Sequence, residues 1–517
     1  MEPYPEKRAL ARVSKDGRSG RWQRRGIGAL PAPIEYWHCL ATAVNRGWEW
    51  VPGGPAERFG KMLFQSQGFI LLFLPVAVAA YYAVAPWPAV RQTVLIVASL
   101  VFYGWWDIRF IPLLLGQIGA SWLMSLLYER SGRRWPLYLG VVLNLASLAT
   151  FKYLDFLIGI VQSVIGVALP RAHLVLPIGI SFFSFQLISY LVDRMRKDAP
   201  LYPLRPFALF VLLFPHLIAG PIVRHNELVP QFELDPRREG LWARISLGLF
   251  LFTLGFAKKV LLADRLSEIA DPLFNRVPRH MLDLGEAWTA TLAFTFQLFC
   301  DFSAYTEMAI GIALLFGLLL PENFRRPYVS TSVREFWRRW HISLSNFIRD
   351  YLYIPLGGSR HGVPRYVFAT MAAMGICGLW HGAGWTYVVW GLWHGFGLLV
   401  CHGWQSLKRP MPALAGWAVT MLFVMVGWVL FRAADFHTAA SVLYSLVGGG
   451  GFKGGVQNIG LITVGALVSV LVPSAHEIKD MRPLPWPAIA VTAAALAGFC
   501  VLEVGNGPPL NFIYFQF

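Results

Sequence analysis

The amino-acid sequence predicts an all-α polytopic membrane protein. Of its 517 residues, 56% are hydrophobic and 14% are charged, whereas an average soluble chain carries about 25% charged residues. Apolar runs recur along the chain, each close to the roughly 20 residues that a helix needs to cross a bilayer. The runs lack the strict alternation of a transmembrane β-barrel. We therefore expect about eleven transmembrane helices, accompanied by re-entrant or interfacial helices.

The apolar runs set the order of the expected helices. Several are short or interrupted by glycine and proline, so some should be half-helices or re-entrant segments that line a cavity. The clearest runs cover residues 69–84, 94–106, 137–150, 174–192, 207–219, 245–262, 287–299, 308–320, 366–379, 385–400, 417–431, 459–472 and 488–502.

The net charge of +16 comes mostly from short loops between these runs. Arg130, Arg133 and Arg134 share one loop, and Arg194 and Arg196 lie in another. Positive loops mark the cytoplasmic side of a membrane protein, here the bacterial inner membrane. Anionic lipid headgroups are therefore the expected partner of these loops, in preference to nucleic acid.

The cysteines indicate neither a disulfide framework nor a zinc site, because they are scattered and odd in number. No His-x-x-x-His or Cys pair has ligand spacing, and no nucleophile elbow, P-loop or dinucleotide fingerprint occurs. We expect no metal and no bound cofactor. The cysteines are Cys39, Cys300, Cys377, Cys401 and Cys500.

Residues 1–61 differ from the rest of the chain. They are rich in Arg, Pro and Gly and lack the apolar core of a signal peptide. We expect a basic, disordered extension over 1–61 and a membrane domain over 62–517. The extension is either a cytoplasmic arm for anionic lipid or the result of a start codon placed too far upstream, and we favour the second.

The most informative stretch covers residues 336–358, where arginines and His341 lie among aromatic side chains. Ionisable groups are costly at bilayer depth, so such a cluster is a functional-site hypothesis. Histidine suits proton transfer because it titrates near neutral pH. His341 and His381, the latter between Trp380 and Gly382, are the leading candidates. A lone histidine would more often be structural, and spacing alone does not rank His381 above His394, which repeats the Trp-His-Gly pattern.

A second polar group interrupts the apolar residues near position 300. Asp301, Ser303, Tyr305 and Glu307 should face a cavity, since lipid would leave the carboxylates unsolvated. They either orient a substrate or a histidine, or they join helices by hydrogen bonds. The two interpretations have equal support.

Two further expectations concern the membrane interface. Residues 332–349 should form one amphipathic helix, which places His341 one turn after Trp337. Lys258 and Lys259 should form a pair whose ammonium groups extend from a helix end into the headgroup region.

Several long motifs run in order through residues 62–517. They read PIGISFFSFQLISYLVD, FPHLIAGPIVR, CDFSAYTEMAIG, PENFRRPYVSTSVREFWRRWHISLSNFIRDYLYIPLGG, GLWHGAGWTYVVWGLWHG and FIYFQF. With these motifs the chain resembles the membrane-bound O-acyltransferase family, and most of all its bacterial alginate O-acetyltransferase branch. The family pattern places its two key histidines at His341 and His381 and ranks His394 second. Glu307 stands where the branch commonly has Asp, and the extension 1–61 has no counterpart.

The resemblance implies helices around a central funnel or tunnel that joins the cytoplasm to the exterior. The donor would be acetyl-CoA, and the acceptor a hydroxyl of an exported polysaccharide such as alginate, reached directly or through a periplasmic SGNH-type partner. His381 would be the general base and His341 would orient the donor or stabilise charge, with an acetyl-His381 intermediate as an open alternative. The residues expected to bind substrate are Asp301, Ser303, Tyr305, Glu307, Arg338, Arg339, Trp340, Asn346 and Trp380.

Two other functions remain open. Intramembrane charges and broken helices would also suit a polysaccharide transporter or flippase. A D-alanyl transferase of the teichoic-acid type would use the same chemistry with a carrier-protein thioester as donor.

Overall fold

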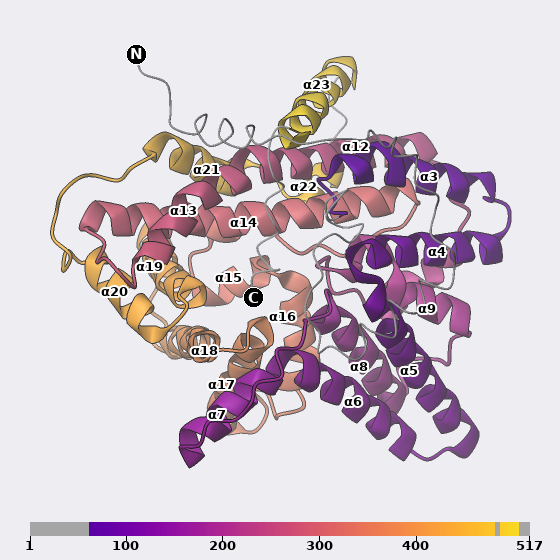
Figure 1. The fold of residues 1–517 in the computed structure, drawn as a ribbon, viewed down its shortest axis with the longest axis horizontal. Coiled ribbons are helices and arrows are strands. Elements are labelled where there is room, and N and C mark those ends of the chain that lie inside the picture. Colours follow the sequence, from indigo (N-terminus) through magenta and orange to yellow (C-terminus); the bar gives the residue numbers. More distant parts are fainter. Residues whose placement is uncertain (1–61, 481–485, 506–517) are drawn as a thin grey trace, which may run out of the picture. The chain divides into compact units, whose positions relative to one another are not determined.

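The computed structural model describes residues 62–480 and 486–505, and the regular elements in these residues are helices (Figure 1). No strand occurs within the described residues, in agreement with the predicted all-α architecture. The expected extension 1–61 and the terminal FIYFQF motif lie outside the described residues.

The helices follow one another along the chain with short connections. They include 3-10 and π segments, which are labelled η. In order they are η2 (Phe69–Phe73), α3 (Leu74–Ala83), α4 (Pro88–Asp107), η3 (Ile108–Phe110), α5 (Ile111–Ser131), α6 (Trp135–Leu148), η4 (Ala149–Tyr153), α7 (Leu154–Ile165), α8 (Ile180–Arg196), α9 (Leu204–Leu212), α10 (Phe214–Leu217), α11 (His225–Leu228), η5 (Val229–Glu233), α12 (Leu241–Ala257), η6 (Lys258–Ala263), α13 (Asp264–Arg276), α14 (Leu284–Leu315), η7 (Pro327–Val329), α15 (Val333–Arg339), α16 (Ile342–Ile348), η8 (Arg349–Tyr353), α17 (Gly362–His381), α18 (Trp385–Ser406), α19 (Ala413–Arg432), α20 (Phe436–Leu446), α21 (Ile459–Leu471), α22 (Ala475–Asp480) and α23 (Trp486–Gly505).

Six helical segments of the described chain are long and apolar enough to cross a membrane. Three shorter apolar helices accompany them, at Phe69–Ala83, Ile459–Leu471 and Val491–Val504. Six is fewer than the expected number of about eleven, because several predicted runs form shorter helices or share one continuous segment. The six segments are Pro88–Ser131, Trp135–Ile165, Leu241–Arg276, Leu284–Leu315, Gly362–His381 and Ala413–Arg432.

Helix α14 forms the centre of the described helices. It packs along α12 and α13 and also contacts α19, α20 and α21 (Figure 1). Every residue of α14 from Ala293 to Leu315 is buried. Helix α14 therefore contacts protein on all sides and leaves the lipid-facing positions to its neighbours.

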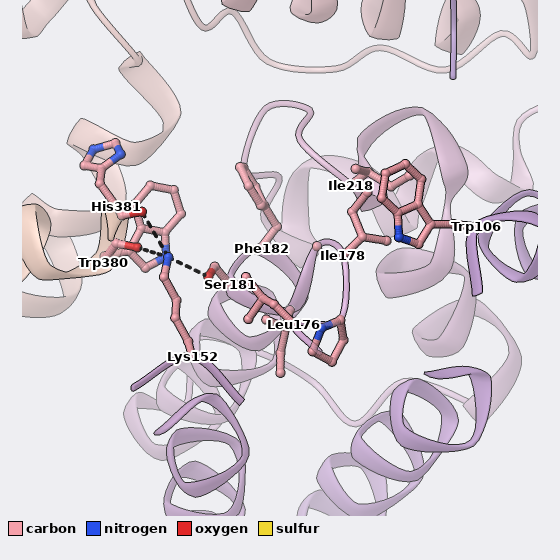
Figure 2. Close-up of a pocket in the computed structure, with 12 residues that line it drawn as sticks. Trp106, Lys152, Leu176, Ile178, Ser181, Phe182, Ile218, Trp380 and His381 are labelled. Carbon is pink, nitrogen blue, oxygen red and sulfur yellow. Dashed lines mark hydrogen bonds between the residues drawn. The ribbon is translucent and has the colours of Figure 1, made fainter. Parts of the chain in front are cut away.

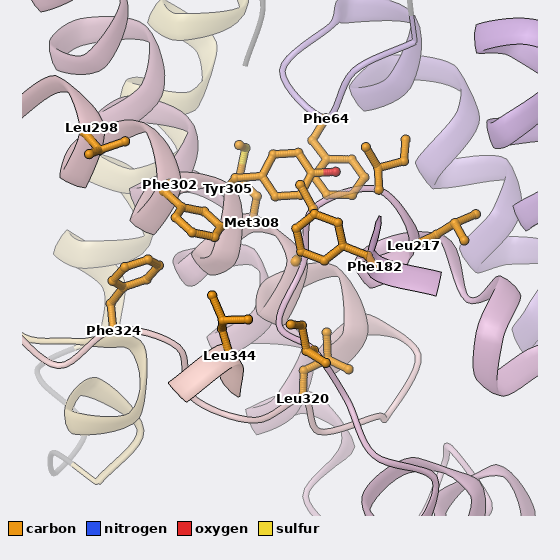
Figure 3. Packing of buried hydrophobic residues seen from close by; sticks show 14 of the residues in the cluster. Phe64, Phe182, Leu217, Leu298, Phe302, Tyr305, Met308, Leu320, Phe324 and Leu344 are labelled. Carbon is orange, nitrogen blue, oxygen red and sulfur yellow. The ribbon is translucent and has the colours of Figure 1, made fainter. Parts of the chain in front are cut away.

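The first described residues are anchored to α14 through aromatic packing (Figure 3). The ring of Phe64 stacks on Tyr305 of α14 at 4.7 Å and on Phe102 of α4 at 5.5 Å, measured between ring centroids. Phe64 is fully buried. Stacked aromatic pairs of this kind contribute about 0.5–1.5 kcal/mol beyond the area that they bury.

The prediction of one continuous helix over residues 332–349 is wrong. Helix α15 ends at Arg339 and α16 begins at Ile342, with His341 in the left-handed region at φ 42° and ψ 55°. The preceding segment stabilises the break: the amide of Arg325 donates to the Arg339 carbonyl, and the amide of Ile342 donates to the Asn323 carbonyl, each at 2.9 Å. These tertiary hydrogen bonds replace helical ones, so His341 turns inward and is fully buried.

Candidate active site

The imidazole of His341 is held by the side chain of Asn323. His341 Nδ1 lies 3.0 Å from Asn323 Oδ1, and the same oxygen accepts from the amide and the hydroxyl of Ser343. A backbone N–H can only donate, so this atom of Asn323 is the oxygen and His341 Nδ1 carries the proton. In the neutral ring, Nε2 is then the nitrogen with the lone pair.

His381 is the last residue of α17 and packs among aromatic rings. Its ring lies 4.8 Å from Trp380, 4.9 Å from Trp390 and 5.3 Å from Phe431, between centroids. It also lines a cavity of about 130 Å³ (Figure 2). His381 is therefore both buried among aromatic rings and adjacent to a cavity.

The two leading histidines approach the same indole. The ring of Trp380 lies 4.8 Å from His381 and 6.1 Å from His341, between centroids. Trp380 lines the cavity beside His381, whereas His341 is not among its lining residues. The fold thus places both histidines next to Trp380, but of the two only His381 lines this cavity.

Lys152 lines the cavity too, and the sequence analysis missed it. Its ammonium donates to the carbonyl oxygens of Trp380 and His381 and lies 3.4 Å from the hydroxyl of Ser181 (Figure 2). A lysine among apolar residues, in LATFKYLDFLIG, was the available signal. Asn323 was missed as well, because nothing in the sequence relates it to His341.

His394 lies in an aromatic core. Its Nδ1 accepts a hydrogen bond from the Trp337 indole at 3.2 Å, and its ring contacts Trp390 at 4.9 Å and Phe423 at 5.5 Å. It is fully buried and does not line the cavity of His381. This position fits a structural role for His394.

A larger cavity of about 670 Å³ borders α15, α16, η8, α17 and α18. Arg338 and Asn346, both expected substrate-binding residues, line it. Arg339 instead pairs with Glu335 at 2.9 Å, and Trp340 packs against Trp428 at a ring distance of 4.9 Å. Of the expected substrate-binding residues between 338 and 346, Arg338 and Asn346 therefore line this cavity, whereas Trp340 packs in the core and Arg339 is partly exposed.

A third cavity, of about 560 Å³, lies on the other side of η8. Asp193 accepts from the Tyr351 hydroxyl at 2.7 Å, and Arg224 forms an ion pair with Asp350. Burial acts to raise the pKa of Asp350, but hydrogen bonds from Arg349 and Arg224 outweigh it and lower the pKa. Asp350 therefore stays ionised at neutral pH and keeps η8 attached to the α10–α11 connection.

The acidic group of α14 forms ion pairs between helices. Glu307 contacts Lys258 at 2.6 Å, and Asp301 contacts Lys259 at 2.8 Å. Ser303 accepts from Lys258 at 3.2 Å. None of these residues lines the three cavities above. The contacts match the helix-joining interpretation.

The predicted interfacial position of Lys258 and Lys259 is wrong. The two residues are only 5% and 3% exposed. They lie in the π-helical η6, next to the carboxylates of α14. An ion pair in a low-dielectric interior offsets the desolvation of both charges, which explains why these ammonium groups do not reach the headgroup region.

Among the described residues, no three His, Cys, Asp or Glu side chains gather where they could hold a metal ion. The structure shows three separate cavities near α17 and η8, and the tunnel implied by the resemblance stays a prediction.

Comparison with known proteins identifies the family. The model of the membrane-bound O-acyltransferase family matches residues 145–437, which include Lys152, Asn323, His341 and His381. The chain belongs to the membrane-bound O-acyltransferase family. It is accordingly a multi-pass membrane enzyme that transfers acyl groups to oxygen, as its sequence motifs predict.

Curated relatives fall into two groups. The chain is 37% identical over 505 residues to "Probable alginate O-acetylase AlgI" of Pseudomonas putida, covering 88% of this chain and 100% of the relative. It is 38% identical over 423 residues to the "Peptidoglycan O-acetyltransferase" of Helicobacter pylori, covering 75% and 80%. The "Teichoic acid D-alanyltransferase" of Streptococcus thermophilus is more distant, at 26% identity over 324 residues, covering 60% and 72%.

Proposed function

We propose that the protein moves an acetyl group from cytoplasmic acetyl-CoA to a hydroxyl of an exported polysaccharide, in the bacterial inner membrane. The acceptor is alginate or a similar polymer, reached directly or through a periplasmic SGNH-type partner. The greater identity to relatives named as O-acetyltransferases than to a D-alanyltransferase supports acetyl as the transferred group.

His381 is the general base of the proposed reaction. The acceptor hydroxyl attacks the thioester carbonyl and forms the C–O bond, while an imidazole nitrogen of His381 takes its proton. The tetrahedral intermediate then breaks its C–S bond, and His381 returns the proton to the departing CoA thiolate. The observation that carries this assignment is the buried position of His381 among the residues that line a cavity, with Lys152 and Trp380 beside it.

The donor is assigned to the cavity of about 670 Å³. Arg334, Arg338 and Arg349 line it, and guanidinium groups suit the phosphates of CoA because they donate in a planar fork. Cys377 also lines it and lies on α17 about one turn before His381. A pantetheine arm that follows α17 from this cavity would bring the thioester towards His381.

His341 supports the reaction from its position near the Trp380 ring. Asn323 fixes its tautomer, so Nε2 can accept a proton or a hydrogen bond. We assign it to orienting the donor or stabilising charge in the transition state.

The test is analysis of ester-linked groups on the polysaccharide of a deletion strain. The strain is complemented with the wild-type gene, with His381→Ala, or with His437→Ala, a change at an exposed residue of α20. We expect wild type and His437→Ala to restore O-acetylation and His381→Ala to fail, since losing a general base costs about 10²–10⁴-fold in rate.

Other outcomes would support other functions. Restoration by His381→Ala would remove this histidine from the mechanism. Loss of ester-linked D-alanine in the deletion strain, with acetyl content unchanged, would indicate D-alanyl transfer. Loss of exported polymer with a normal acetyl content per sugar would indicate a transporter.

A further inference from the structure

The end of helix α17 is bonded by a segment far away in the sequence. A helix leaves its last carbonyl groups without partners inside the helix, and here α17 ends at His381 with Gly382 extended. The hydroxyl of Tyr153 donates to the Leu379 carbonyl at 2.9 Å. The ammonium of Lys152 donates to the next two carbonyls, of Trp380 and His381, the latter at 3.1 Å. Two consecutive residues thus bond three consecutive carbonyls.

The local structure of the donor segment makes this possible. Lys152 and Tyr153 are the last residues of the π-helical η4, between α6 and α7. A π turn is wider than an α turn and often marks a functional site. A cation is also favourable at the carboxyl end of a helix, because the end of the helix dipole there is negative.

The hydrogen-bond donors of Lys152 distinguish two roles that this residue could have beside His381. It could bind a substrate oxygen, or it could hold the backbone of His381. An ammonium group has three N–H donors. The Trp380 carbonyl, the His381 carbonyl and the Ser181 hydroxyl, at 3.4 Å, provide three acceptors. Three protein acceptors are thus available to the three donors of the ammonium. Its position fits holding the backbone of His381.

We propose that Lys152 is a positioning residue that fixes the backbone of Trp380 and His381, and through it the position of the His381 imidazole. This inference rests on the proposed role of His381 as general base. With the main chain fixed, the rings of Trp390 and Phe431 hold the imidazole. A general base acts efficiently only in a narrow geometry, and a displacement of about 1 Å can cost about 10²-fold in rate.

The test compares three variants of the full-length protein. Lys152→Met removes the charge and all donors at similar length, Lys152→Arg keeps a charged donor, and Tyr153→Phe removes only the hydrogen bond to Leu379. Hydrogen exchange of the peptide containing residues 379–382 reports the helix end without depending on activity. Transfer of labelled acetyl from acetyl-CoA to polymer, in membrane vesicles of the complemented deletion strain, reports kcat and KM.

We expect Lys152→Met to accelerate exchange at residues 379–382 while peptides of α14 exchange as in the wild type. Its kcat should fall by about 10–100-fold with KM for acetyl-CoA little changed, because the donor site is intact. Lys152→Arg should recover most of the rate. Tyr153→Phe should have the smaller effect, since it removes one neutral hydrogen bond.

Each contrary result has a distinct meaning. Wild-type exchange in Lys152→Met would overturn the bonding role of Lys152 at the helix end. Faster exchange with an unchanged kcat would overturn its role in positioning His381. Full activity of His381→Ala in the same vesicles would instead overturn the proposed function, and the exchange result would still stand on its own.

Discussion

At the scale of single residues, His341 has a left-handed backbone, which residues other than glycine rarely adopt. Helical periodicity, however, placed His341 within a continuous helix, whereas a non-glycine residue at φ 42° needs tertiary support. That support comes from the main chain of Asn323 and Arg325, and no pattern local to His341 could reveal it.

Asn323 should be necessary for the role of His341. Asn323→Ala removes the acceptor shared by His341 Nδ1 and Ser343, and unsatisfied buried donors cost about 1–3 kcal/mol. We expect a lower thermal midpoint in detergent and a loss of acetyl transfer. Asn323→Asp is the matched control, because it retains an acceptor oxygen and should keep more activity. Equal activity of the alanine variant and wild type would contradict this arrangement.

His341 and His381 should act as a unit. Each single alanine variant is expected to lose most of the acetyl transfer, and the double variant should be little worse than the more damaged single one, because effects within one catalytic unit are not additive. Rates of labelled acetyl transfer from acetyl-CoA measure this. Effects that multiply would mean that the two histidines serve separate steps.

Arg338 offers a separate test of the donor cavity. Arg338→Ala should raise KM for acetyl-CoA and leave kcat nearly unchanged, since phosphate contacts far from the thioester bind ground and transition states alike. Arg237→Ala is a control, because Arg237 is exposed and pairs with Asp235 away from the cavity. A fall in kcat at constant KM would indicate that the cavity serves another purpose.

At the scale of helices, the pairs between η6 and α14 hold the two elements in one register. Lys258 reaches Glu307 and Ser303, and Lys259 reaches Asp301 and Asp264. The sequence showed the charges and the helices but not which helix faces which. The sequence alone therefore allowed two interpretations of the carboxylates, and it predicted an interfacial position for both lysines that is wrong.

Breaking one of these pairs should destabilise the protein more than removing the pair. Lys258→Met leaves Glu307 buried without its cation and should cost about 3–5 kcal/mol of unfolding free energy. The double variant Lys258→Met/Glu307→Leu should recover part of this loss, since no uncompensated charge remains. Thermal midpoints in one detergent test the order. A double variant less stable than the single would argue against a purely structural pair.

At the scale of the whole molecule, the sequence predicted the fold class and the family. Composition and apolar runs report burial in a membrane, which is why the all-α class follows from them. The number of spans was less predictable, because runs such as 137–150 continue through a π segment into the next helix. Lys152 was missed because its partners, the carbonyl groups of Trp380 and His381, lie more than two hundred residues further along the chain.

The extent of the membrane domain can be tested by truncation. A chain that begins at Met62 should insert and transfer acetyl groups, because Phe64 and its contacts with Tyr305 and Phe102 remain. A chain that begins at Phe69 should be less stable, since it lacks the buried Phe64 ring. Complementation and thermal midpoints of the two chains check this. Failure of the chain that begins at Met62 would show that residues 1–61 are required.

The burial of α14 from Ala293 to Leu315 has a consequence for biogenesis. Asp301 and Glu307 would make this helix, presented alone, a poor substrate for insertion from the translocon into lipid, where each charge near the middle costs about 2.5–3.5 kcal/mol. Their partner lysines in η6 are synthesised earlier, and only α13 and one short connection separate them from α14. We therefore expect the segment from α12 to α14 to leave the translocon together, with its charges already neutralised before lipid surrounds it.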